Sequence, residues 1–165
     1  MGKKILLAVL FFLFFYTAFS QNYYEDTYNK LKDDIYYPQI DSFLGNGDYD
    51  SVVNLAEPAF DYYFKRGDTD RAIYLFNVCM YFPTAMGLYD ITMPSLLDKV
   101  EFMESRIDTV NVHFGTTLHI IAFGYKYYNE IEKSIPFFER AIAIYEKTET
   151  PLLHLCSIYQ SFAPI

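Results

Sequence analysis

Apolar side chains recur at intervals of three and four residues through most of this sequence. One run, formed by Leu118, Ile121, Ala122 and Tyr125, places four such side chains on one face of a helix. The alternation of apolar and polar residues that marks a half-buried strand is scarce, and no Asn-Gly pair joins two β-branched runs. The spacing therefore predicts an all-α fold.

Glycine, proline and polar turn residues divide the chain into short segments. The strongest breaks fall at 45–48, 67–68, 83, 94, 108–115, 129 and 151. They predict helices over about 24–44, 49–66, 69–82, 84–91, 95–107, 114–128, 131–147 and 151–162. Pro58 and Pro136 fall inside these helices and are expected to bend them or to lie near a first turn. The short connections make consecutive helices antiparallel.

The first twenty residues have the three parts of a secretory signal peptide. Lys3 and Lys4 precede an apolar run over 5–16, and the small residues Ala18 and Ser20 suit a cleavage site before Gln21. An uncleaved anchor is the alternative, but the apolar run is shorter than the roughly 20 residues that span a bilayer. We therefore expect cleavage, export to the periplasm or the medium, and no membrane insertion of residues 21–165.

Charge and cysteine content narrow the classes of function. The chain has 13 Lys and Arg against 21 Asp and Glu, a net charge of −8. Nucleic-acid binding is disfavoured, because it needs clustered basic side chains that displace counterions from phosphates. Cys79 and Cys156 could form a disulfide in an exported protein, but each stands where a helix needs a small buried residue, and we favour that role.

An internal repeat is the most informative feature. Leu118, Ile121, Ala122 and Tyr125 have the spacing of W-x2-L-G-x2-Y, and Ser134-x3-Phe138 follows nine residues later in the place of A-x3-F. A shift of about 34 residues predicts a second match at the positions of Leu152, Leu155, Cys156 and Tyr159. These residues resemble the tetratricopeptide repeat (TPR) family. The resemblance implies antiparallel helix pairs stacked as a right-handed solenoid.

The resemblance covers the chain unevenly. The units that match best are 114–147 and 148–165, the second of them incomplete, and a weaker unit spans 49–82 with Ala72-x3-Phe76 in its second helix. In that weaker unit Phe60 stands where the family has a small residue. The incomplete unit leaves an apolar face uncovered, which indicates either a longer protein or self-association at that end.

No pattern of catalytic or metal-binding residues is present. His113, His119 and His154 are scattered, and HExxH, CxxC and G-x-S-x-G motifs are all absent. We expect no enzyme activity, no metal and no cofactor; a helical enzyme acting on polysaccharide is disfavoured because no paired carboxylates stand out.

The resemblance also implies a site. In the family, residues of the first helix beside the packing positions line a groove that binds peptides. Transferred by phase, these positions are His119, Phe123, Lys126 and Tyr127 in one unit and Glu57, Asp61, Phe64 and Lys65 in the other. The alternative is ordinary surface and inter-helix packing.

The expected function is a non-catalytic scaffold that binds a partner protein or peptide on the concave face of its repeats. Its rival is the extracytoplasmic sensory region of a longer, membrane-bound signalling protein.

Overall fold

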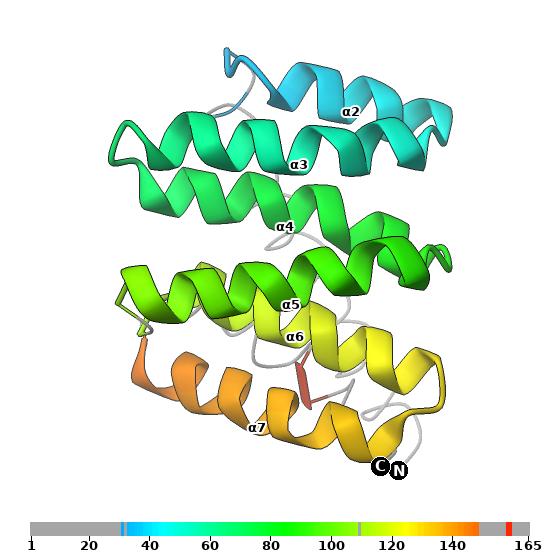
Figure 1. The fold of residues 1–165 in the computed structure, drawn as a ribbon, viewed down its shortest axis with the longest axis vertical. Coiled ribbons are helices and arrows are strands. Elements are labelled where there is room, and N and C mark those ends of the chain that lie inside the picture. Colours follow the sequence, from blue (N-terminus) through cyan, green and yellow to red (C-terminus); the bar gives the residue numbers. More distant parts are fainter. Residues whose placement is uncertain (1–30, 32, 109, 149–157, 160–165) are drawn as a thin grey trace, which may run out of the picture. The chain divides into compact units, whose positions relative to one another are not determined.

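The computed structural model describes residues 31, 33–108, 110–148 and 158–159. The expected leader and the matches at Leu152, Leu155 and Cys156 lie outside these residues. The described helices are α2 (Tyr37–Asn46), α3 (Tyr49–Phe64), α4 (Thr69–Ala85), α5 (Tyr89–Arg106), α6 (Val112–Tyr127) and α7 (Ile131–Lys147) (Figure 1). The chain divides into two compact units, Met1–Gln39 and Ile40–Ile165, and the helices from α3 to α7 belong to the second.

The prediction of an all-α fold is confirmed for the described residues, which form helices and no strands. None of these helices has both the length and the apolar character that a membrane span needs.

The predicted helix boundaries are wrong in two regions of the chain, before α2 and around Pro83 and Pro94. Residues 33–36 are not helical, so the single helix expected over 24–44 does not exist, and α2 begins at Tyr37 instead. The helices expected over 84–91 and 95–107 are also replaced, because α4 extends through Pro83 to Ala85 and α5 runs unbroken through Pro94. The free energy gained by burying the surrounding side chains outweighs the loss of one backbone hydrogen bond at each proline. Around Pro94, for example, Thr92, Met93 and Leu96 are all buried.

Four of the turns between helices share one conformation. A residue with positive φ ends α2, α3, α4 and α6; these residues are Gly47 (71°), Gly67 (80°), Gly87 (94°) and Asn129 (62°). In each turn the next residue's N–H donates to the carbonyl five positions earlier, as from Asp68 to Tyr63 at 3.1 Å. This is the Schellman C-cap, which favours glycine because the left-handed conformation is strained for residues with a Cβ. The breaks expected at 45–48, 67–68 and 129 are confirmed, and that at Gly87 was not expected.

The four helices after these turns bury equivalent positions. Five residues after the turn residue the side chain is compact and 0% exposed: Val52, Ala72, Thr92 and Ser134. Nine residues after it the side chain is again 0% exposed: Ala56, Phe76, Leu96 and Phe138. Twelve residues after it stand Ala59, Cys79, Lys99 and Ala141. The helices α3, α4, α5 and α7 thus share one packing register, and Lys99 is the one charged residue among these buried positions.

Each helix from α5 onward contacts the two helices before it. Within the second unit α3 packs on α4, α6 packs on α7, and α5 lies against both α4 and α6. Alternate helices also touch and run parallel: Glu57 meets Lys99 between α3 and α5, Asn77 meets Thr117 between α4 and α6, and Glu104 meets Arg140 between α5 and α7. These contacts join residues 36 to 42 positions apart, somewhat more than the period of about 34 residues used in the sequence comparison.

The residues that carry the repeat match in the sequence are buried in part. Ala122 and Ser134 are 0% exposed, as the small packing positions require. Tyr125 is half-buried and packs on Phe137, with ring centroids 5.7 Å apart. Tyr159, which the second match places in the same role, is 46% exposed and donates a hydrogen bond to Glu146. Its ring is therefore not enclosed as the match predicted.

Gly115 permits the close approach of α6 to α7. A Cβ on Gly115 would lie 2.8 Å from Cε1 of Tyr145, a ring that is only 1% exposed and whose hydroxyl bonds to Thr116. We expect Gly115→Ala to lower the free energy of unfolding by about 1–2 kcal/mol, because the buried ring must shift. Chemical denaturation measures this. Gly45→Ala is the matched control, since its Cβ meets nothing within 4 Å; an equal loss there would remove the packing explanation.

Candidate functional site

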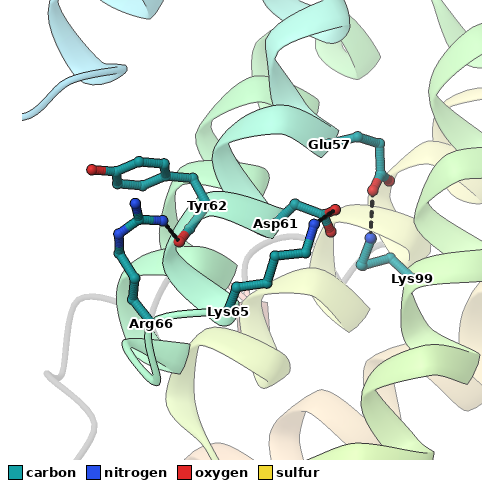
Figure 2. A network of polar contacts seen from close by, with 6 residues as sticks. All are labelled: Glu57, Asp61, Tyr62, Lys65, Arg66 and Lys99. Carbon is teal, nitrogen blue, oxygen red and sulfur yellow. Dashed lines mark hydrogen bonds and ion pairs between the residues drawn. The ribbon is translucent and has the colours of Figure 1, made fainter.

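The residues predicted on α3 lie at its junction with α5. Glu57 accepts a hydrogen bond from the Lys99 ammonium at 2.6 Å, and the Lys99 side chain is 10% exposed against 52% for Glu57 (Figure 2). The ammonium also lies over the ring of Phe60, 4.0 Å from its centroid, and 5.4 Å from the centroids of both Phe76 and Phe102. A buried charge is tolerated only when it is paired and hydrogen-bonded. One carboxylate and three ring faces supply that compensation.

Lys99 is unusual because of its place in the shared register. The equivalent positions of α3, α4 and α7 hold Ala59, Cys79 and Ala141, which are all buried. In α5 the aliphatic part of the Lys99 side chain fills this position, and its ammonium group reaches the carboxylate of Glu57 on α3. The Glu57–Lys99 pair therefore fixes α3 against α5 at one point.

The remaining α3 residues differ in exposure. Phe64 is half-buried and stacks on Phe60 at 5.3 Å, and it also meets Phe102 at 5.3 Å. Asp61 and Lys65 form an exposed ion pair at 2.7 Å, one turn apart on the same helix (Figure 2). Exposed pairs of this kind contribute little to stability because solvent and salt screen them. Phe64 is thus part of the packing, and Asp61 and Lys65 are surface groups.

The residues predicted on α6 lie against α4 and α7. Phe123 approaches Tyr127 with ring centroids 6.1 Å apart, and Tyr81 of α4 lies 6.4 Å from Phe123. Phe82 continues the series, 5.3 Å from Tyr81. Tyr81 and Phe82 are each 45% exposed and Tyr127 is 60% exposed. We call Tyr81, Phe82, Phe123 and Tyr127 the α4–α6 aromatic surface.

The structure separates the two predicted groups of groove residues. Glu57 and Phe64 contact α5, whereas Phe123 contacts α4. His119 lies between α6 and α7 and is half-buried, with its ring 5.9 Å from that of Phe138. Lys126, also half-buried, is in the last turn of α6. Of the eight residues, Phe123 and Tyr127 are the pair that the structure joins in an aromatic surface.

Tyr81, Phe82 and Lys99 were not expected at a site from the sequence. For Tyr81 and Phe82 the signal in the sequence is the distribution of charge, since from residue 72 to 89 and from 109 to 125 the chain has no Asp, Glu, Lys or Arg. Lys99 lies outside these stretches, and its burial depends on the tertiary contact with α3. These two stretches form most of α4 and α6, which pack side by side. The exposed carboxylates of the neighbouring helices lie on α3, α5 and α7 and are Asp50, Glu57, Asp61, Asp90, Asp98, Glu101, Glu104, Glu132, Glu139 and Glu146.

Two titratable side chains between the helices, those of His113 and Tyr89, have pKa values shifted in the direction that favours the neutral form. Burial lowers the pKa of His113, and the Asp70 carboxylate partly opposes that shift. Burial also raises the pKa of Tyr89 to about 12, and the Glu130 carboxylate, which accepts from the Tyr89 hydroxyl at 3.4 Å, adds to the rise. Within the described ranges, no three His, Cys, Asp or Glu side chains converge on a point where a metal could bind.

Cys79 is a free thiol on the buried side of α4. Its side chain is 0% exposed and unpaired, which confirms the preference for a small buried residue at this position. Burial raises the pKa of the Cys79 thiol to about 12. Because the thiolate is the reactive form, we expect no alkylation of Cys79 by iodoacetamide in the native protein and full alkylation in denaturant. Peptide mass mapping measures both. Native labelling of Cys79 would contradict this placement; Cys156 lies outside the described residues.

Comparison with protein-family models, curated proteins and solved structures gives no match for this chain.

Proposed function

We propose that this protein is a non-catalytic scaffold that binds another protein through an array of helical repeats. The observation that carries the proposal is the α4–α6 aromatic surface, an exposed aromatic cluster on two helices that lack charged side chains over most of their length. Exposed aromatic rings free of neighbouring charges are typical of the centres of protein interfaces. Tyrosine suits such a surface, since its ring is apolar and its hydroxyl group forms hydrogen bonds.

The order of helix contacts supports a repeat array. In such arrays each element packs mainly on its neighbours in sequence, and similar contacts recur along the chain. Here alternate helices meet at separations of 36 to 42 residues. We propose that the antiparallel pairs continue as a right-handed, TPR-like solenoid, with the weaker unit at 49–82 and the better-matched unit at 114–147.

The residues proposed to contact the partner are Phe123 and Tyr127, joined by Tyr81 and Phe82. Lys126, one position before Tyr127, is the one Lys or Arg of α6. Asp61 and Lys65 form a second, charged contact area on α3, while Glu57 and Phe64 hold α3 against α5. His119 acts through its packing on Phe138.

The test is affinity capture with the purified protein as bait. We expect Phe123→Ala with Tyr127→Ala to reduce recovery of bound protein about tenfold or more, as removal of interface hot spots does. Val110→Ala is the matched control, because Val110 is 47% exposed but precedes the first turn of α6, at the end away from Tyr127. If the double variant retains the same proteins in the same amounts, the α4–α6 aromatic surface is not the binding site.

Export is part of the proposal and rests on Lys3, Lys4 and the apolar run over 5–16. The exported protein is then expected to begin at Gln21. Its intact mass tests this, since retention of residues 1–20 would contradict cleavage.

A further inference from the structure

We propose that the α4–α6 aromatic surface is where two copies of this chain associate as a symmetric dimer. This inference rests on the proposed function and names the partner of that same site. It places self-association on α4 and α6, and not at the C-terminal end where the repeat pattern suggested it.

The charge of the chain limits where two copies can meet. With a net charge of −8, two copies repel one another wherever their carboxylates are opposed. The helices α3, α5 and α7 each carry at least three exposed carboxylates. By contrast, α4 has one acidic residue, Asp70 in its first turn, and α6 has none. Of the described helices from α3 to α7, α4 and α6 thus carry the fewest acidic side chains, so two copies that meet on them oppose the fewest carboxylates.

Large apolar side chains are exposed on this face. Tyr81 and Phe82 are each 45% exposed, and Met86, one turn beyond Phe82, is 62% exposed. Tyr127 is 60% exposed at the neighbouring end of α6. Aromatic side chains and methionine are enriched in interface cores, and charged side chains are depleted there. The face thus has the composition of an interface core.

The geometry of α4 and α6 gathers these side chains into one patch. The contacts Tyr74–His113, Asn77–Thr117 and Tyr81–Phe123 proceed in the same order along both helices, which therefore run side by side and parallel. The exposed rings gather at the shared C-terminal end of the pair. In a dimer with two-fold symmetry the same patch on each copy forms the interface, and every contact between two residues occurs twice. A patch of modest area on one copy therefore contributes its contacts twice to the dimer.

The experiment is sedimentation velocity on the purified exported protein over a wide range of concentration. We expect a species of twice the mass of one chain, which persists at high salt because no ion pair holds it. Tyr81→Asp with Tyr127→Asp puts four new carboxylates into the dimer interface, two from each copy, and is expected to give a monomer. Val110→Asp, which places a carboxylate on an equally exposed residue near the start of α6, is expected to remain a dimer.

Both substituted tyrosines are exposed, so the double variant is expected to keep its far-ultraviolet circular dichroism and its melting temperature; Phe82→Asp alone provides a second variant. A wild-type protein that is monomeric at every concentration overturns the dimer. So does a dimer that survives in a folded double variant. If the wild type is monomeric but captures a different protein in a manner that depends on Tyr127, the dimer is wrong while the scaffold function stands.

Discussion

Replacing Phe138 with alanine is expected to lower the free energy of unfolding by about 3–5 kcal/mol, the usual loss for a fully buried phenylalanine. Phe138 is 0% exposed, lies nine residues after the turn residue Asn129, and packs against His119 of α6. The loss combines the transfer free energy of the ring with the cavity that remains. Urea denaturation followed by circular dichroism measures it.

The neighbouring Glu139 is exposed and is the matched control. Glu139→Ala is expected to change the free energy of unfolding by less than about 0.5 kcal/mol. A loss below about 1 kcal/mol for Phe138→Ala would mean that α7 does not present this face to α6.

The second large effect is expected at the α3–α5 junction. Glu57→Ala removes the carboxylate partner of Lys99, whose side chain is 10% exposed, and leaves the ammonium over the rings of Phe60 and Phe102. An uncompensated buried charge costs about 3–5 kcal/mol. Because Glu57 is itself half exposed, solvent reduces the loss, and we expect about 2–3 kcal/mol.

A double variant separates the charge from the packing. Glu57→Ala with Lys99→Met removes both charges and keeps an unbranched apolar side chain at a position that is compact and apolar in α3, α4 and α7. Replacement of a buried ion pair by apolar groups is often neutral or stabilising, so the double variant is expected to regain most of the stability lost in Glu57→Ala. If it is as unstable as the single variant, the loss does not come from an unpaired ammonium.

Local features of the fold were accessible from the sequence. The turns at Gly67 and Asn129 and the buried pairs Ala72 with Phe76 and Ser134 with Phe138 depend on residues close together in the chain. Such signals need only the helical period and the conformational preference of glycine or asparagine. The span of α7 was predicted as the structure has it, because a turn signal precedes it and its apolar residues keep one period.

Non-local features were not accessible in the same way. Pro83 and Pro94 were interpreted as breaks, since the burial that holds α4 and α5 together around them is tertiary. The opposite error concerns Gly87, which ends α4 and was not recognised as a break. The aromatic surface requires Tyr81 and Phe123, which are distant in sequence, to meet across parallel helices, and no local pattern contains that information.

Alternate helices lying side by side create both the α3–α5 junction and the α4–α6 aromatic surface. Carbodiimide coupling, which joins a carboxylate to an amine in direct contact, tests this arrangement through Glu57 and Lys99, whose charged atoms are 2.6 Å apart. After proteolysis and mass spectrometry we expect a peptide of α3 joined to a peptide of α5 by an amide between these two side chains. Coupling of Lys99 to a carboxylate outside α3, or native acetylation of Lys99 as fast as that of the exposed Lys65, would contradict the arrangement.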